Sequence, residues 1–430
     1  MTMSPPRIRA EMSGIAEAPG KVWFWELAAA VIDADRCVQC GACVAACPTD
    51  SIGIGSDDLP KLVKMCTGCS LCWDFCPRGG LRYESTWMPA KAPASPFGVA
   101  GAVARSIVDD VSTTPVDDWR MTGADPAPRL GRVIEACAAR VRPGGRMHTL
   151  RAQDGGVVTA ILLASLAAGE IDGAVVARED PDQPWKGVPH LATAPAEIRA
   201  AAGSFYNQTM ALSRLDLAAA GLPPDARIAV VGTPCEIQGL RALQAREWRR
   251  GTSRVDAVVL AIALLCTKSF DYGKLMVREL SETRGLSLAD IGKVDVIHGR
   301  MIVEDRTGAT LVDEPVKDFH GAALKGCDEC ADFLGRGADL SIGSVGSAPG
   351  YSSVIVRTEA GGRALAAVRG DLEVSELDSP EDLERLDRLD FKTASKALHR
   401  PFDPEGPLFI DFAEHVTFYG GTDRAPVWSE

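Results

Sequence analysis

The sequence lacks the features of several broad classes of protein. No stretch reaches the roughly 18 consecutive apolar residues that span a bilayer. The most apolar run, 157–168, is short and predicts a buried helix or half of a βα unit. The first 20 residues carry scattered charges and no apolar segment of a signal peptide. We therefore expect a cytoplasmic protein without a membrane span.

Basic residues are also scarce. The chain has 46 Lys and Arg against 58 Asp and Glu, which gives a net charge of −12, and the basic residues form no stripe. A surface of this charge repels the phosphates of nucleic acid. We therefore expect no nucleic-acid partner.

Motifs for catalysis by side chains alone are missing as well. The six histidines are scattered, with no metal-ligand pair at helical spacing. Neither a nucleophile elbow nor a pair of catalytic carboxylates occurs. Any catalysis must therefore depend on bound cofactors, and no catalytic side chain is predicted.

The chain of 430 residues is too long for one core and predicts two or three packed units. Helical stretches alternate with short β-branched runs after residue 131, which favours a mixed α/β fold, and strands are expected at 172–177, 227–232, 255–265 and 339–344. A helix is expected to begin at Ser379. The predicted units are an N-terminal arm with a short helix (1–33, the helix at 21–32), a cysteine-rich module (34–87), a linker (88–130) and an α/β domain (131–430).

Eight of the 13 cysteines lie in the cysteine-rich module, and the odd total argues against a secreted disulfide framework. The run C-x2-C-x2-C-x3-C-P occurs twice, 29 residues apart, so the module is an internal duplication. This spacing is typical of a bacterial ferredoxin with two [4Fe–4S] clusters, in which the fourth cysteine of each run serves the other cluster. The predicted first set is Cys37, Cys40, Cys43 and Cys76, and the second set is Cys66, Cys69, Cys72 and Cys47.

Structural zinc is the alternative for this module. Zinc prefers two separated C-x2-C pairs to four cysteines in one run closed by proline. The spacing therefore favours iron–sulfur clusters and an electron relay.

Five cysteines remain in the α/β domain. Cys235 and Cys266 follow expected strands, and Cys327 and Cys330 form a C-x2-C pair. These four would suit a third [4Fe–4S] cluster, a zinc ion, or simple core positions, and their spacing leaves the choice open. Cys137 lies in a helix-like segment and is expected to be a core thiol.

Two glycine-containing loops are candidates to hold a phosphate or a flavin. The first, 153–160, precedes the apolar helix, and the second, 343–347, follows an expected strand. Backbone N–H groups at such places approach an anion closely. Neither loop matches a dinucleotide fingerprint or a P-loop, so plain turns are the alternative.

Four motifs in order carry a family resemblance: AQDGGVVTA, GTPCEIQGLRAL, LLCTKSFDY and KGCDECADFLGRGADLSIGSVGS. From about Arg132 to Gly362 the chain resembles the family of coenzyme F-420 hydrogenase/dehydrogenase beta subunits. Residues 24–82 resemble the input subunit of archaeal proton-pumping F-420 dehydrogenases. The resemblance implies a mixed α/β domain that binds FAD and a third [4Fe–4S] cluster, held by Cys235, Cys266, Cys327 and Cys330.

The resemblance also implies a set of cofactor-binding residues. Where many members are expected to read Gly-Ser-Lys-Tyr, this chain has Phe205 in place of the lysine. A lost cation would change contact with an anionic partner, and Lys325, Lys268 and Arg357 are candidates to replace it. The implied cofactor-binding residues are Asp154, Gly155, Gly156, Thr159, Ser204, Tyr206, Asn207, Thr233, Pro234, Lys325, Gly343, Ser344 and Gly346.

The resemblance implies that reduced coenzyme F-420 exchanges hydride with FAD and that single electrons pass through the clusters. The partner would be a dehydrogenase, a hydrogenase or a ferredoxin, in the cytoplasm or peripheral on a membrane complex. One alternative is a ferredoxin-dependent FAD and iron–sulfur reductase of an organic substrate, similar to tetrapyrrole reductases. A non-enzymatic iron–sulfur scaffold would leave the glycine loops unexplained.

Overall fold

The structure is a computed structural model that describes residues 23–69, 71–78, 130–148, 152–244 and 251–398. The arm expected at the N-terminus up to residue 22 lies outside the described residues, as does the expected linker except for Leu130. Within the described residues, no helix combines the length and the apolar character needed to cross a membrane.

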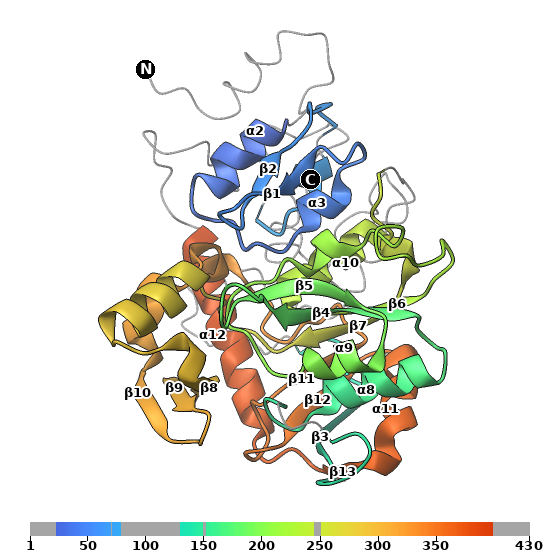
Figure 1. The fold of residues 1–430 in the computed structure, drawn as a ribbon, viewed down its shortest axis with the longest axis vertical. Helices are drawn as coiled ribbons and strands as arrows, with labels where there is room; N and C mark the ends of the chain where they lie inside the picture. Colours follow the sequence, from blue (N-terminus) through green and yellow to red (C-terminus); the bar gives the residue numbers. More distant parts are fainter. Residues whose placement is uncertain (1–22, 70, 79–129, 149–151, 245–250, 399–430) are drawn as a thin grey trace, which may run out of the picture.

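The cysteine-rich module forms a small unit, drawn in blue in Figure 1. Each cysteine run enters a short helix, because gaps of two residues leave room for little more than one turn. Phe24, Leu27 and Trp73 pack against the thiols as the core of the module. Its elements are α2 (Phe24–Leu27), the π-helical η1 (Ala28–Ile32), α3 (Ala42–Ala46), the antiparallel pair β1 (Ile52–Ile54) and β2 (Pro60–Leu62), and α4 (Leu71–Asp74).

A mixed sheet of eight strands organises the larger domain, in the order β13-β3-β12-β11-β7-β6-β4-β5. The neighbours β4, β6, β7 and β11 are parallel, and antiparallel strands complete both sides. The mixed α/β fold expected from the sequence is confirmed. The strands are β3 (Glu135–Val141), β4 (Gly173–Glu179), β5 (Gly187–Ala192), β6 (Ile228–Gly232), β7 (Val258–Leu264), β11 (Leu340–Gly343), β12 (Ser352–Val356) and β13 (Leu372–Ser375).

The four strands expected from buried β-branched runs are the four parallel strands of this sheet. One local prediction is wrong: Cys137 lies in strand β3, not in a helix. Its segment, EACAARV, has helix-forming residues, but antiparallel pairing with β12 and β13 on both sides overrides that preference. The predicted burial of the thiol is confirmed, with 4% of Cys137 exposed.

Two cores cover the two faces of the sheet. Along β6, Ala229 faces one core and Val230 faces the other, as the alternation of a buried strand requires. Helices α8 (Val157–Ala167) and α11 (Glu359–Val368) pack into the first core, with α9 (Pro195–Ala200) beside α8. Helix α10 (Pro234–Gln244) and the ferredoxin module pack into the second, so the module occupies a place that a covering helix would otherwise take (Figure 1).

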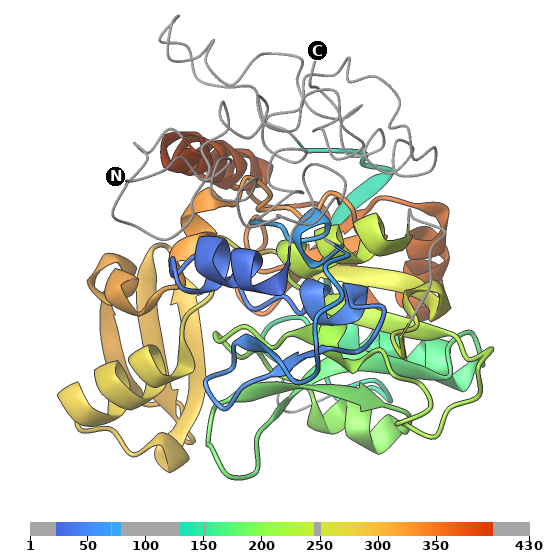
Figure 2. The same cartoon turned by 90° about the horizontal axis from the view of Figure 1, so that it is seen from above.

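A second sheet stands beside the first, as Figure 2 shows. It joins β8 (Ile291–Ile297), β9 (Arg300–Asp305) and β10 (Thr310–Pro315) in an antiparallel meander. The π-helical segment η4 (Gly273–Thr283) and the 3-10 segment η6 (Val316–Ala322) pack against it around a core of its own.

The helix expected to begin at Ser379 is confirmed as α12 (Pro380–Leu398), with Glu381 and Asp382 in its first turn. It packs against η7 (Lys325–Glu329), the segment that carries Cys327. The remaining short 3-10 segments are η2 (Ala211–Arg214), η3 (Val255–Ala257), η5 (Leu288–Asp290) and η8 (Arg369–Asp371).

Candidate cofactor site at the carboxyl edge of the sheet

Four candidate segments meet at one edge of the large sheet. Because β6, β7 and β11 are parallel, their carboxyl ends lie together, at the edge where open α/β sheets bind ligands. Cys235 follows β6 in the first turn of α10, Cys266 lies just beyond β7, and Gly343 ends β11. Gly155 reaches the same edge, where its carbonyl accepts a 2.7 Å hydrogen bond from the N–H of Val141, the last residue of β3.

The four thiols of the third predicted set come together at this edge. Burial raises the pKa of Cys266 well above its usual value, and the neighbouring thiols Cys327, Cys235 and Cys330 raise it further. Burial also raises the pKa of Cys327 to about 11. Thiols that influence one another in this way share a small buried space.

A chain of hydrogen bonds ties three of the loops around these thiols. Thr233 Oγ1 lies 3.1 Å from Cys235 Sγ and accepts a 2.8 Å hydrogen bond from Gln208 Nε2. Ser269 Oγ donates to Gln208 Oε1 at 2.8 Å, and the Ser269 N–H donates to Cys327 Sγ at 3.4 Å. The sequence offers no motif for Gln208 or Ser269, because their role arises only when distant loops meet.

Several thiols of the ferredoxin module lie near members of the set to which they were assigned. Burial raises the pKa of Cys43 well above its usual value, and the nearby Cys37 and Cys76 add to this effect. In the other half, burial raises the pKa of Cys69, and Cys47 raises it further. Cross-ligation predicts these neighbours, and the individual ligand assignments stay a prediction.

The donor chemistry of each group suits an iron–sulfur cluster. Within the parts of the chain that the structure describes, no three His, Cys, Asp or Glu side chains are arranged to hold one metal ion. A four-iron cluster instead spreads four thiolates around a cube, and each group offers four buried or half-buried thiols.

The first glycine loop packs directly on the sheet. A Cβ atom on Gly155 would lie 2.3 Å from the Ala139 carbonyl oxygen and 2.8 Å from the Ser352 nitrogen, so only glycine fits. Gly156 has a φ of 70° and begins α8 without a capping side chain, and Thr159 is buried in the first turn. The start of this 11-residue helix suits an anionic group, because its first N–H groups lack intrahelical acceptors.

The second glycine loop is a turn that joins β11 to the neighbourhood of α12. A Cβ atom on Gly343 would lie 2.7 Å from the Leu265 side chain, and Gly346 has a φ of 90°. The Gly346 carbonyl accepts a hydrogen bond from the Ser379 N–H at 3.1 Å, and the Ser344 carbonyl accepts one from the N–H three residues later. These contacts explain the glycines by local packing, and a role in binding a cofactor stays a prediction.

A polar cluster links the first glycine loop to the smaller sheet. Tyr206 Oη donates to Asp295 Oδ1 at 3.0 Å, and Lys293 Nζ lies 3.0 Å from Asp295 Oδ2. Burial raises the pKa of Asp154 to about 6, and nearby Asp295 raises it while Lys293 lowers it. Asp154 and Tyr206 were predicted from the sequence, whereas Asp295 and Lys293 were not.

A small pocket that is open to solvent lies beside this cluster. Asn207 braces its rim, since its side chain both donates to and accepts from the Gly187 backbone at 2.8 Å. Ser204 is half-buried on the same segment. The aromatic residues of the lining are Trp185, Tyr206, Phe270 and Tyr272.

Comparison with known proteins gives this geometry a family. Residues 145–216 and 225–380 match the N-terminal part and the C-terminus of the coenzyme F-420 hydrogenase/dehydrogenase beta subunit, and residues 30–82 match a 4Fe-4S dicluster domain. The two beta-subunit matches together cover more than half of the chain. The chain belongs to the family of coenzyme F-420 hydrogenase/dehydrogenase beta subunits. The resemblance identified from the four motifs is thereby confirmed, and the chain is an oxidoreductase subunit with an iron–sulfur domain.

Two relatives and one solved structure show how far the similarity extends. The beta subunit of the coenzyme F-420 hydrogenase of Methanothermobacter thermautotrophicus is 34% identical over 50% of this chain and 74% of its own. A subunit of the F(420)H(2) dehydrogenase of Methanosarcina mazei is 27% identical over 86% of this chain and 93% of its own. A chain in the F-420-reducing [NiFe] hydrogenase complex of Methanosarcina barkeri matches with a TM-score of 0.57 at 28% identity, covering 63% of this chain and 92% of that one.

The cationic side chains that could replace the lysine expected at position 205 lie in different surroundings. Lys325 is 64% exposed and pairs with Asp35 of the ferredoxin module at 3.0 Å, and Lys268 pairs with Asp328 at 2.8 Å. Phe205, in place of the expected lysine, packs edge-on against Trp185 beside the pocket. None of these contacts tests the predicted cofactor roles.

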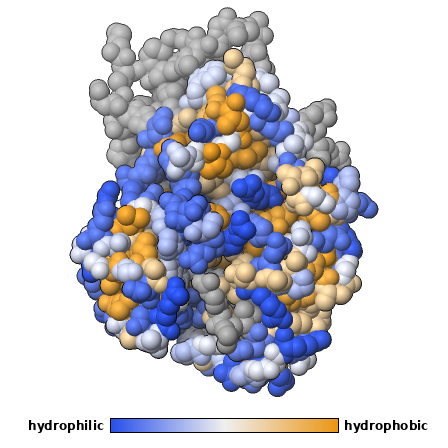
Figure 3. Space-filling model, viewed as in Figure 1, coloured by the Kyte–Doolittle hydropathy of each residue, from blue (hydrophilic) through white to orange (hydrophobic). Residues whose placement is uncertain are grey.

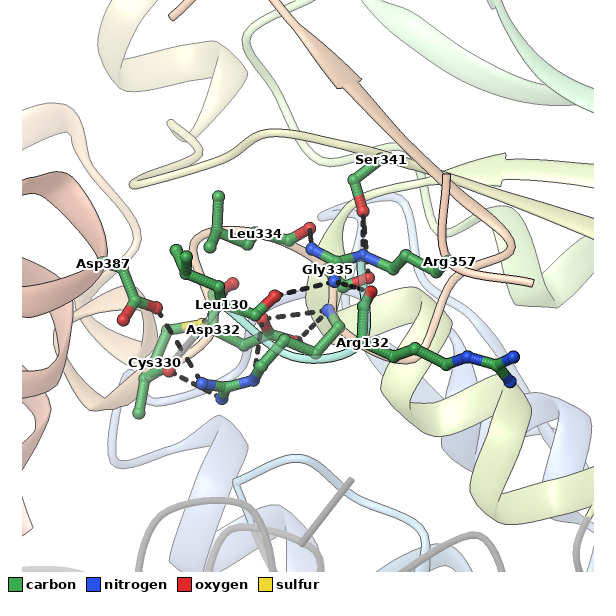
Figure 4. Close-up of polar contacts among 11 residues, drawn as sticks. Leu130, Arg132, Cys330, Asp332, Leu334, Gly335, Ser341, Arg357 and Asp387 are labelled. Atoms are coloured by element: carbon green, nitrogen blue, oxygen red, sulfur yellow. Dashed lines mark hydrogen bonds and ion pairs between the residues drawn. The ribbon is translucent and has the colours of Figure 1, made fainter. Parts of the chain in front are cut away.

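Arg357 has an internal role in the family's domain, as Figure 4 shows. Its guanidinium is buried and donates to Ser341 Oγ at 2.7 Å and to the carbonyls of Leu130, Arg132 and Leu334. These bonds join residues 130–132, which precede strand β3, to the loop before β11. Its charge therefore stabilises the fold inside the protein.

Proposed function

We propose that this protein takes electrons from reduced coenzyme F-420 and passes them singly to a partner redox protein, using FAD and three [4Fe–4S] clusters. The observation that carries the proposal is the meeting of the third thiol set with the ferredoxin module. Cys235 and Cys40 lie in one continuous core, so entry and relay machinery form one body. FAD, when bound, would supply the conversion between two-electron and one-electron transfer that a hydride donor and iron–sulfur clusters require.

The similarity to named relatives supports this substrate. The chain covers 93% of the F(420)H(2) dehydrogenase relative and 74% of the F-420 hydrogenase relative. Both of those proteins are named as subunits, which supports a partner redox protein for this chain. The similarity to the dehydrogenase relative extends over most of both chains.

The residues around the glycine loop fit the needs of a flavin. The start of α8 at Gly156 offers backbone N–H groups to a phosphate of FAD. Asp154, with a pKa of about 6, and Tyr206 would hold protons at the carboxyl and the phenol beside the aromatic pocket. The aromatic lining suits stacking on a planar ring such as a flavin or a deazaflavin.

The second thiol set lies on the side of the module suited to electron exit. The segment just before Cys66 exposes 55% of Val63 and 85% of Met65, and Trp25 is 43% exposed. Figure 3 shows hydrophobic residues gathered on the face of the module in view. Exposed apolar residues of this kind support contact with a partner protein.

The test is reduction of the protein by candidate donors. The protein is purified without oxygen, its flavin spectrum is recorded, and it is mixed with reduced F-420, NADH or reduced ferredoxin. We expect rapid bleaching of the flavin by reduced F-420 alone. Bleaching by ferredoxin only would overturn the proposal and favour the reductase of an organic substrate.

Iron analysis tests the third cluster with a matched pair of variants. Three clusters predict about 12 iron atoms per chain. Cys330→Ser should lower this to about eight, whereas Cys137→Ser, which removes a thiol buried in β3, should leave it unchanged. About eight iron atoms in the unmodified protein would remove the third set from the list of ligands.

A further inference from the structure

The two halves of the ferredoxin module repeat the same cysteines but not the same charges. The 29-residue repeat places Arg36 opposite Met65 and Arg78 opposite Thr49. The two arginines flank the first thiol set, and the other two residues flank the second. The arginines are only 6% and 3% exposed, whereas Met65 is 85% exposed. The module is symmetric in its thiols and asymmetric in its buried charge.

Both arginines reach from the module into the loop of the third thiol set. Arg78 Nε donates to the carbonyl of Gly326 at 2.5 Å, next to Cys327. Arg36 donates from Nε and Nη2 to the two oxygens of Glu329 at 2.7 and 2.8 Å. Arg36 Nη2 also donates to the Arg78 carbonyl at 2.9 Å, which ties the two arginines together.

Backbone packing brings the same half of the module against the same loop. A Cβ atom on Gly326 would lie 2.0 Å from the Arg36 carbonyl oxygen, so the two backbones are in direct contact. Cys40 of the first set shares a core with Cys235 and α10. Cys47 and Cys72 of the second set pack in the module's own core, where Cys43 of the first set also lies, and neither belongs to the core that Cys40 shares with Cys235.

We propose that the first thiol set faces the third and that Arg78 is the positioning residue at the junction between them. The proposal rests on the proposed function, in which both sets hold [4Fe–4S] clusters. Arg78 would lie between an electron donor on the third set and an electron acceptor on the first. One electron passes from the donor, which is oxidised, to the acceptor, which is reduced, and no bond is made or broken.

The charge of Arg78 gives this position its effect. A guanidinium keeps its proton in proteins, so the charge is constant. Reduction makes a cluster more negative, and a buried cation stabilises the reduced state because the interior screens charge weakly. The reduction potential of a cluster depends on such nearby charge. The second set has the uncharged Thr49 at the equivalent position.

Redox titration with paired variants tests the junction. Arg78→Gln and its repeat counterpart Thr49→Gln are titrated with dithionite and mediators, and the cluster signals are followed by electron paramagnetic resonance. We expect Arg78→Gln to disfavour reduction at the first and third sets about tenfold, which is 59 mV for a one-electron couple. Thr49→Gln should leave both of those sets unchanged. Full iron content with no shift, or a shift at the second set only, would overturn the proposal.

If the Arg78→Gln variant does not retain iron, the magnetic coupling between clusters in the protein with Arg78 intact tests the same proposal. In the fully reduced protein, the third cluster should couple magnetically to the first-set cluster more strongly than to the second. Removal of the third cluster by Cys330→Ser should then alter the first-set signal and spare the other. Stronger coupling to the second set would overturn the proposed order.

Neither readout uses F-420, so the outcomes separate the two proposals. If the titrations behave as expected while reduced F-420 fails to bleach the flavin, the substrate is wrong and the junction stands. If F-420 reduces the flavin but the Arg78 titration shows no shift, the junction is wrong and the substrate stands.

Discussion

Single ionisable residues that are partly or fully buried shape the environment of the proposed flavin site. Asp154 is the clearest case, because its carboxyl lies near Asp295, which raises its pKa, and Lys293, which lowers it. Burial without full compensation disfavours the ionised form of a carboxylic acid. The ionised carboxylate of Asp154 therefore destabilises the folded protein at neutral pH.

Replacing Asp154 by Asn should stabilise the flavin-free protein at high pH. The pKa of Asp154 is raised from 3.8 to about 6, so its favourable contribution is present below pH 4 and is lost as pH rises through 6. At pH 8 we expect Asp154→Asn to raise the free energy of unfolding by about 2 kcal/mol relative to its effect at pH 4. Denaturant unfolding at both pH values, with the exposed Asp225→Asn as control, measures this difference. A difference independent of pH would contradict it.

Residues whose spacing along the sequence marks a set of cluster ligands were predictable. Residues that act through contacts between distant segments were not. The repeated cysteine run identifies the ferredoxin module because cluster ligation demands that spacing. Gln208, Ser269 and Arg78 carry no such signal, since each acquires its partner from a segment far along the chain. The sequence alone gives no reason to prefer these polar residues to others.

At the scale of elements, the carboxyl edge of the large sheet brings the site together. The four parallel strands were predictable from their β-branched runs, and their ends carry Cys235, Cys266 and Gly343. The smaller sheet, β8 to β10, was not predicted, although it supplies Asp295 and Lys293. Its strands are half-exposed and mixed in composition, which weakens the pattern that marks a buried strand.

Alanine at Gly155 should disrupt this edge. The added Cβ would meet the backbones of β3 and β12, so one of the strands or the loop must shift. We expect a loss of about 1–3 kcal/mol in the free energy of unfolding, together with weaker flavin retention. Gly370→Ala is the control, because a Cβ there meets nothing within 4 Å. Unchanged stability with lost flavin would instead assign Gly155 a direct contact with the cofactor.

At the scale of the whole molecule, three thiol sets form one body from sheet edge to module surface. The contact between the module and α10 could not be predicted, because the interface joins segments about 200 residues apart through small residues such as Ala42 and Gly239. The module was predictable from its cysteine spacing, whereas its place on the sheet depends on contacts between distant segments, among them the ion pair of Arg36 with Glu329. Phe24 and Leu27, which were expected to belong to the N-terminal arm, pack in the core of the module.

Cys72→Ser should separate electron entry from electron exit. Cys72 belongs to the second set, which lies farther along the proposed route than the flavin and the third set. We expect flavin bleaching by reduced F-420 to stay within about twofold of the unmodified rate, because hydride uptake needs only the entry site. Reduction of a one-electron acceptor should fall at least about tenfold. Stopped-flow absorbance measures both, with Cys137→Ser as control, and loss of hydride uptake in a folded variant would contradict the order.

The duplicated origin of the ferredoxin module raises a question of orientation. Two halves with the same cysteine pattern offer two nearly equivalent ways to seat the module on the larger domain. Only the half with Arg36 neutralises Glu329, which is 2% exposed. The reversed seating would present Met65 to that carboxylate and remove its buried ion pair with Arg36, at a cost of about 3–5 kcal/mol. The ion pair between Arg36 and Glu329 thus favours one of the two orientations of the module. It determines which half of the module faces the larger domain and which half faces outward.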